Sequence, residues 1–248
     1  MPAMKFTTSS DCATLDEAVT VLGSQGWVVL APQLLVKGVR RALLHFGEIA
    51  PQYDGKETWE VMVRPGFESL PYSQSSNGIG AHTEAPVFAM PPKYLALHCL
   101  RQAKCGGGHT MLADGLDFCE RTGMVETCTR TEVNFVATVK PGTTQRQSLL
   151  SPLLSAAADG PIFRFSYNLF KYGDVNPSED AIVSPDAALN QNSDLVLLTE
   201  LAEKYFDEHG AAVLVPEGSM LIWNNHRMMH SRSRFEDKAR HLTRYWLR

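Results

Sequence analysis

Apolar and polar positions along the chain predict many short strands and a few amphipathic helices. Apolar side chains at helical spacing cover residues 14–24, 32–46 and 193–208, and Pro32 suits the first turn of the second helix. Short apolar runs predict strands at 27–30, 94–100, 109–113, 132–139, 161–167, 211–215, 219–223 and 242–247.

Glycine and proline punctuate these short runs, which favours an antiparallel sandwich or barrel over alternating strands and helices. Three long connections, over 64–81, 140–160 and 173–191, are typical of lids or binding loops. No linker rich in Pro, Gly or Ser separates two hydrophobic halves. We therefore predict one domain over residues 1–248, mainly β with flanking helices, with the helices of residues 1–50 packed on the β core.

Composition narrows the class of protein. The 248 residues are 44% hydrophobic and 20% charged, which is enough to bury a sizeable core. The net charge of −4 argues against a nucleic-acid-binding protein, although the segment from His226 to Arg248 carries seven Arg or Lys against Glu236 and Asp237. Apolar residues interleave with these cations, so we expect the segment to enter the core and some of its charge to meet a small anion.

The cysteines and the hydropathy of the chain indicate in which cellular compartment the protein is expected. No apolar run approaches the ~18 residues of a membrane helix, and the first residues lack the apolar stretch of a secretory signal. Five cysteines, an odd number without a CxxC pair, favour a reducing compartment. We expect a cytoplasmic protein with no membrane or nucleic-acid partner; a homo-oligomer is compatible with the sequence.

The first candidate for chemistry is His82-Thr83-Glu84. On an extended segment, residues i and i+2 point to the same side, so His82 and Glu84 can converge on one ion. His230, beyond the strand at 219–223, is a candidate third ligand. Two histidines and one carboxylate leave three open positions on a metal, which suits Fe(II) and O2; zinc accepts the same ligands, so residue type leaves both metals open.

Arg240 and Arg244 follow His230 at a spacing that places both on one face of a strand. Two guanidinium groups that point inward could bind a dicarboxylate with the paired hydrogen bonds that lysine cannot form. The alternative is that both are solvated surface charges.

Three segments together resemble a known family. They are Gly78-Ile-Gly-Ala-His82-Thr-Glu84, the strand and glycine turn from Leu95 to Gly115, and Trp223-Asn-Asn-His-Arg-Met-Met-His230-Ser-Arg with the following Arg240 and Arg244. In this order they resemble the TauD / clavaminate-synthase-like Fe(II)- and 2-oxoglutarate-dependent dioxygenases, over roughly residues 75–248. The resemblance implies a double-stranded β-helix, the jelly-roll or cupin-like core.

The resemblance also implies roles for residues. His82, Glu84 and His230 would bind Fe(II), Thr110 and Arg240 would bind the distal carboxylate of 2-oxoglutarate, and Arg244 would approach the C1 carboxylate or an acidic group of the substrate. An unactivated C–H bond would then be oxidised by O2, with release of succinate and CO2, in hydroxylation, desaturation or cyclisation.

The chain departs from the family pattern at two positions. Glu84 stands where many TauD-like members have Asp, so substrate analogies from those members do not transfer. His226 stands where the family often has Arg, and we expect it to support the site or lie at the surface, not to act as a fourth ligand.

Substrate contacts are predicted on two segments. Ser75 and Asn77 lead into the metal motif, and Arg164, Tyr167 and Asn168 are polar groups within an apolar run. A buried arginine requires an anion, which could be a substrate carboxylate or an internal Asp or Glu. We expect a small-molecule substrate, an amino acid or a natural-product intermediate.

Two other functions compete with an oxygenase. One is a non-catalytic metal-binding jelly-roll protein, and the other is a zinc-dependent hydrolase that uses the same three ligands. A second zinc site at His98, Cys99, Cys105 and His109 matches no common ligand spacing, and core packing is favoured there.

Overall fold

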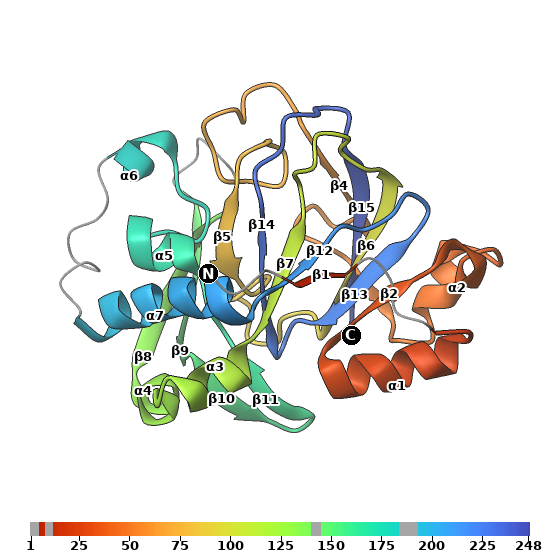
Figure 1. The fold of residues 1–248 in the computed structure, drawn as a ribbon. Helices are drawn as coiled ribbons and strands as arrows, with labels where there is room; N and C mark the ends of the chain where they lie inside the picture. Colours follow the sequence, from red (N-terminus) through yellow and green to blue (C-terminus); the bar gives the residue numbers. More distant parts are fainter. Residues whose placement is uncertain (1–4, 8–11, 140–144, 184–192) are drawn as a thin grey trace.

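Two facing β-sheets form the centre of the molecule (Figure 1). In this computed structural model the described residues are 5–7, 12–139, 145–183 and 193–248. The first sheet has the strand order β1 (Lys5–Thr7), β12 (Ala211–Val213), β7 (Thr110–Asp114), β14 (Met228–Arg232) and β5 (Ile79–His82). The second has the order β2 (Trp27–Leu30), β13 (Met220–Asn224), β6 (Tyr94–Arg101), β15 (His241–Leu247) and β3 (Ile49–Ala50), and β4 (Thr58–Met62) also pairs with β15.

Side chains that point alternately inward and outward along the strands form the core between the two sheets. Leu95, Leu97 and Cys99 of β6 point inward, while Ala96 between them packs on the outer side. On β15, Leu242 and Trp246 likewise lie in the inner cluster. Arg244 lies between Leu242 and Trp246 on the same strand. Since every second side chain of a strand points to the same face, its guanidinium also lies between the two sheets.

Short helices cover the outer face of the second sheet. Helix α1 (Leu15–Gln25) begins after Thr14, whose side chain accepts a hydrogen bond from the backbone N–H of Glu17. The helix predicted over 32–46 is wrong as one element. It consists of a 3-10 turn at Pro32–Leu34 and α2 (Val39–Leu43), separated by Gly38 with φ of 104°, which a continuous helix cannot contain.

The outer face of the first sheet carries the remaining helices, on the opposite side of the molecule from α1 and α2 (Figure 1). They are α3 (Gly115–Arg121), α4 (Val125–Arg130), α5 (Tyr167–Tyr172), α6 (Glu179–Val183) and α7 (Ser193–His209). Helix α7 confirms the helix predicted over 193–208, and its Leu195, Leu198 and Tyr205 are buried. In the part of the chain that the structure describes, no helix is both long and apolar enough to cross a membrane.

Two hairpins replace much of the loop predicted over 140–160. Strand β8 (Glu132–Thr138) pairs with β9 (Arg146–Pro152), and β10 (Leu154–Ala157) pairs with β11 (Gly160–Phe163). The side chains of β9 are mostly exposed, so this strand lacks the apolar run that marks buried strands. Residues 140–144 lie outside the described part, as do residues 184–191 of the connection predicted over 173–191.

The strand predicted over 161–167 is also wrong at its end. β11 stops at Phe163, and Ser166 caps α5 by accepting a hydrogen bond from the backbone N–H of Leu169. Tyr167 and Asn168 therefore begin a helix. The sequence patterns predict no strand at β1, β3, β4 or β14 and no helix at α3, α4 or α6, whereas the mainly β architecture with flanking helices is confirmed.

Candidate metal centre

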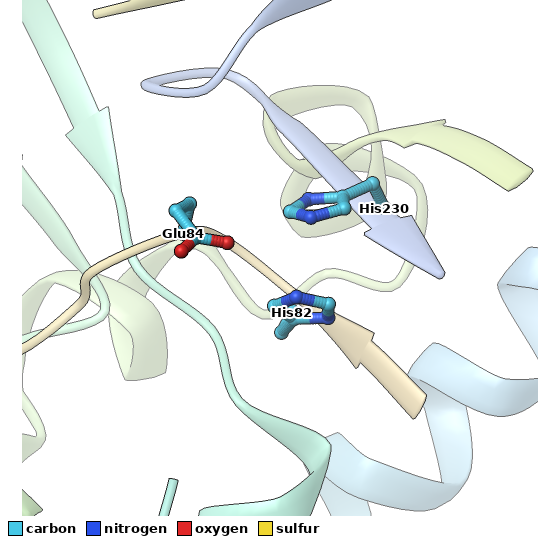
Figure 2. Close-up of side chains that lie close together, drawn as sticks. All are labelled: His82, Glu84 and His230. Carbon is cyan, nitrogen blue, oxygen red and sulfur yellow. The ribbon is translucent and has the colours of Figure 1, made fainter. Parts of the chain in front are cut away.

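His82 and His230 face each other across two neighbouring strands. They are direct partners in the antiparallel register of β5 and β14, and their ring centroids are 4.0 Å apart. Glu84 follows two residues after His82, while Thr83 between them bonds to Phe165 through its backbone N–H, at 2.9 Å. Potential ligand atoms of the two histidines and Glu84 lie within 4.8 Å of one another, and Figure 2 shows the three side chains converging.

The backbone around Glu84 is held by Asn225. The N–H of Glu84 donates to Oδ1 of Asn225 at 2.7 Å, and Nδ2 of Asn225 donates back to the carbonyl of Glu84 at 3.1 Å. Ala85, the next residue, has a left-handed φ of 54°. A non-glycine residue rarely adopts this conformation, so the chain turns at Ala85 at some energetic cost.

The two histidines are prepared as neutral ligands. Nδ1 of His82 lies 2.8 Å from the carbonyl oxygen of Gly80; because a carbonyl only accepts, Nδ1 carries the proton and Nε2 keeps its lone pair. Burial lowers the pKa of His82, and burial together with the nearby His82 and Arg244 lowers the pKa of His230 well below its usual value. Neutral imidazole is the form that binds a metal ion.

The carboxylate of Glu84 has an ion-pair partner and a hydrogen-bond partner. Nη1 of Arg244 lies 2.8 Å from Oε1 of Glu84, and the hydroxyl of Tyr53 donates to the same oxygen at 3.3 Å. Burial, with the adjacent Glu84 charge, raises the pKa of Tyr53, so its hydroxyl keeps its proton. Gln52 holds Arg244 in turn: Nε of Arg244 donates to Oε1 of Gln52, and Nε2 of Gln52 donates to the backbone carbonyl of Arg244, both at 2.9 Å.

A cavity of about 280 Å³ opens onto these residues. His82, Glu84 and His230 line it, as do Thr110, Arg232, Arg240 and Arg244. Its remaining wall is largely apolar and aromatic, and includes Tyr53, Trp59, Val61, Phe67, Tyr72, Val139 and Val175.

Arg240 is a buried cation without an acidic partner among the described residues. Its side chain is only 2% exposed, Nη2 donates to the carbonyl of Gly108 at 3.0 Å, and Nε has no partner. Burial lowers the pKa of Arg240 to about 10, so the group is charged at neutral pH. An unneutralised buried guanidinium that faces a cavity is suited to binding an anion.

Arg232 is the buried arginine that the sequence did not reveal. Its Nη2 donates to the backbone carbonyls of Tyr72, Ser75 and Asn77, and burial lowers the pKa of Arg232 to about 9. Its pairing with Thr110 in the β14–β7 register places it beside the predicted 2-oxoglutarate contacts. The alternation from His230 to Arg232 is the signal that would have identified it, once β14 was known to be a strand.

The five predicted substrate contacts separate into two groups. Asn168 lines the cavity, whereas the other four are absent from its described lining. Asn77 donates to the backbone carbonyls of Glu68 and Leu70, and Ser75 accepts from the N–H of Asn77. Arg164 bonds to the hydroxyl of Ser155 and to the carbonyls of Phe88 and Ala89, and the ring of Tyr167 packs over Gly80.

The remaining histidines and cysteines considered for metal binding have other surroundings. His226 is buried and its Nε2 donates to the carbonyl of Pro91 at 3.0 Å. Cys99 is in the core, where burial raises its pKa to about 11. Among the residues described, His82, Glu84 and His230 form the one group of three or more potential ligands.

Comparisons with known proteins identify relatives. The family model described as "Taurine catabolism dioxygenase TauD, TfdA family" matches residues 11–122 and 162–246. Dioxygenase str8 of Strobilurus tenacellus is 27% identical over 205 residues, which cover 79% of this chain and 44% of that protein. The chain thus spans less than half the length of this curated relative.

Solved structures share the fold. An asparagine oxygenase in complex with Fe(II), hydroxyasparagine and succinate has a TM-score of 0.68 at 16% identity, over 94% of this chain and 77% of that one. The non-heme iron oxygenase OrfP in complex with Fe and α-ketoglutaric acid has a TM-score of 0.61 at 17% identity, over 94% and 79%. These matches confirm the predicted jelly-roll class.

Proposed function

The chain belongs to the TauD/TfdA family of dioxygenases, and on this premise we propose that it is an Fe(II)- and 2-oxoglutarate-dependent oxygenase acting on a C–H bond of a small molecule. The observation that carries the proposal is the pairing of a His-Glu-His cluster with a buried, unneutralised arginine in one cavity. The cluster suits a metal that needs open positions, and the arginine suits a carboxylate co-substrate.

The donor set fits Fe(II). Two neutral imidazoles and one carboxylate, supplied by His82, His230 and Glu84, leave part of the coordination sphere for other ligands. When bound, iron and 2-oxoglutarate reduce O2 to an oxidant that hydroxylates a C–H bond, with succinate and CO2 as the other products.

The chain's own groups orient the reactants. Arg240, with Thr110, binds the distal carboxylate of 2-oxoglutarate in a buried position, where a charge-assisted hydrogen bond is strong. Arg244 and Tyr53 both bond to Oε1 of Glu84 and so fix the carboxylate. The apolar wall of the cavity keeps water away from the reacting bond.

The two competing functions leave features unexplained. A zinc hydrolase with the same ligands has no use for the unpaired charge of Arg240, and neither has a metal-binding protein without turnover. We keep a small-molecule substrate as part of the proposal; asparagine and arginine derivatives are bound by the structural neighbours.

The test is spectroscopic. Anaerobic addition of Fe(II) and 2-oxoglutarate is expected to produce a weak visible charge-transfer band that zinc does not give and that His82→Ala abolishes. His45→Ala changes a half-exposed histidine outside the cavity and is the matched control. Absence of the band in the wild type, or its persistence in His82→Ala, would contradict the assignment.

A further inference from the structure

Glu84 lies just beyond the end of strand β5. The strand ends at His82, opposite His230 of β14, and Glu84 stands on the segment that leaves it (Figure 2). Glu84 is 6% exposed, so its backbone N–H and carbonyl are largely shielded from water. Among the described residues, no backbone group bonds to either of them. Buried peptide groups without partners are costly, so Glu84 needs partners from a side chain.

The side chain of Asn225 supplies both partners. Its Oδ1 accepts from the N–H of Glu84 at 2.7 Å, and its Nδ2 donates to the carbonyl of Glu84 at 3.1 Å. The two bonded groups belong to the two peptide units that flank the Cα atom of Glu84. Because each peptide unit is planar, an amide that holds both units fixes the backbone torsions of this residue. It thereby also fixes the direction in which the Glu84 side chain leaves the backbone.

Asn225 is held in its orientation by further bonds. Its Nδ2 also donates to the carbonyl of Pro92 at 2.9 Å, and its backbone N–H donates to the carbonyl of Lys93 at 2.8 Å. Two carbonyls therefore face the nitrogen of the amide and an N–H faces its oxygen, and only this orientation satisfies all three groups. Asn225 is 1% exposed, so water does not compete for these bonds.

The backbone after Glu84 is strained and would move if this hold were lost. Ala85 has a φ of 54°, a left-handed conformation that is unfavourable for a residue with a Cβ atom. Nδ2 of Asn225 holds the carbonyl of the peptide unit between Glu84 and Ala85. Without that bond, the peptide unit can rotate and relieve the strain at Ala85. The long side chain of Glu84 would carry such a rotation to its carboxylate, and a metal site tolerates displacements of only about 0.5 Å.

We propose that Asn225 is a positioning residue of the metal centre. Through its two hydrogen bonds to the backbone of Glu84, it directs the Glu84 carboxylate toward His82 and His230. Asn225 is absent from the described lining of the cavity, so it acts through Glu84 and does not itself bind the metal or a substrate. The proposal rests on the proposed function of the site, because it requires Glu84 to be a metal ligand.

Metal affinity tests the proposal without any turnover. Co(II) accepts the same nitrogen and oxygen donors as Fe(II) and binds somewhat more tightly, and its visible absorption reports the ligands around it. Each metal-free protein is titrated at a temperature at which circular dichroism shows that it is folded. We expect Asn225→Ala to raise the Kd for Co(II) by about 10- to 100-fold, as for other groups that orient a metal ligand. We also expect it to alter the visible absorption of the bound Co(II).

Two further variants accompany Asn225→Ala. Asn224→Ala is the matched control: it removes an amide at the adjacent position, where Oδ1 of Asn224 accepts from the backbone N–H of His226 at 3.0 Å. This variant breaks a bond of the same corner without touching Glu84, and it should keep the wild-type Kd. Asn225→Ser replaces the amide by a hydroxyl, whose single proton cannot serve the carbonyls of both Glu84 and Pro92. It should also bind Co(II) more weakly, and it preserves the test if Asn225→Ala does not fold.

A double-mutant cycle distinguishes positioning of Glu84 from a general loss of stability. In Glu84→Gln, the carboxylate that Asn225 positions is already lost. Adding Asn225→Ala to this variant should therefore raise the Kd for Co(II) by less than about threefold. A residue that only stabilises the fold would raise the Kd by the same factor in both backgrounds.

The outcomes separate this inference from the proposed function. If the wild type forms no charge-transfer band with Fe(II) and 2-oxoglutarate, the proposed function fails. If the band forms and both Asn225→Ala and Asn225→Ser bind Co(II) as tightly as the wild type, only the positioning role is overturned. The same holds if Asn225→Ala raises the Kd by an equal factor with and without the Glu84 carboxylate.

Discussion

Nη1 of Arg244 forms an ion pair with Oε1 of Glu84, at a distance of 2.8 Å. The residue expected to meet the substrate is therefore tied to a residue expected to bind the metal. Since Gln52 and Tyr53 complete this cluster, a segment far from the metal motif in sequence supports the metal centre. Four predictions probe this arrangement and its surroundings.

Glu84→Gln should greatly weaken Fe(II) binding, because it keeps the shape of the side chain but removes the anionic ligand and the partner of Arg244. We expect the iron content after anaerobic loading and desalting to fall at least about tenfold, as for a loss of 1.4 kcal/mol or more. Glu57→Gln, which breaks only the exposed pair with Arg40, is the control and should retain full iron. Full iron in Glu84→Gln would remove Glu84 from the ligand set.

Gln52→Ala should lower thermal stability, because it leaves buried polar groups of Arg244 without their partners. The expected loss is about 1–3 kcal/mol, which for a chain of this length lowers Tm by roughly 2–4 °C per kcal/mol. Differential scanning calorimetry measures the shift against Gln33→Ala, an exposed control. Equal Tm values for the two variants would show that Gln52 does not anchor Arg244.

Gly108→Ala should weaken 2-oxoglutarate binding without loss of iron. A Cβ atom at Gly108 would lie 2.8 Å from Nε and 3.0 Å from Cδ of Arg240, so the arginine must move. Gly106 has the same φ of +78° but open space around its Cβ position, so Gly106→Ala carries the same backbone strain without the clash. Titration of the charge-transfer band should show a higher Kd for 2-oxoglutarate only in Gly108→Ala, and equal Kd values would place that contact elsewhere.

Cys105 should be the most reactive thiol of the chain. It is exposed, and backbone N–H groups, first that of Glu236, lower its pKa by stabilising the thiolate. The other four cysteines are buried. Iodoacetamide should therefore label Cys105 first, with a rate that rises with pH around a midpoint below about 8.5, the ordinary thiol value. Peptide mass spectrometry checks the site, Cys105→Ser should lose the early label, and a midpoint above that value would contradict the prediction.

The sequence was most informative where a local pattern determines geometry. His82 and Glu84 are two residues apart on an extended segment, and Leu242, Arg244 and Trp246 alternate on one strand, so parity alone places each set on one side. The family model and the shared fold agree with the predicted dioxygenase family and jelly-roll class. The single-domain organisation and the cytoplasmic location stay predictions.

Sequence reasoning was weakest for polar groups whose partners are distant. Arg164 in an apolar run suggested a substrate contact, but its two Nη atoms bond to Ser155 and to the backbone carbonyls of Phe88 and Ala89, and it is absent from the described cavity lining. The sequence does not single out Arg232, because β14, with its methionines and histidine, lacks the usual strand composition. Gln52 bonds to Arg244, which is 192 positions away in the sequence, and no local pattern around Gln52 predicts such a bond.

The carboxylate of Asp174 accepts hydrogen bonds from the backbone N–H and hydroxyl of Thr138, at the end of β8, and from the backbone N–H of Asn176, and this link has a consequence for divergence within the family. The β8–β9 hairpin falls in residues 123–161, which the family model does not match, whereas the metal ligands and the buried arginines fall within the matched parts. The hairpin part of this cavity wall thus lies in a stretch that the family model does not match, whereas Asp174 and Val175 of the same wall lie in the matched part. A relative that differs from this chain only over 123–161 would keep the candidate metal ligands and the buried arginines of the cavity, yet would present a different surface to whatever the cavity binds.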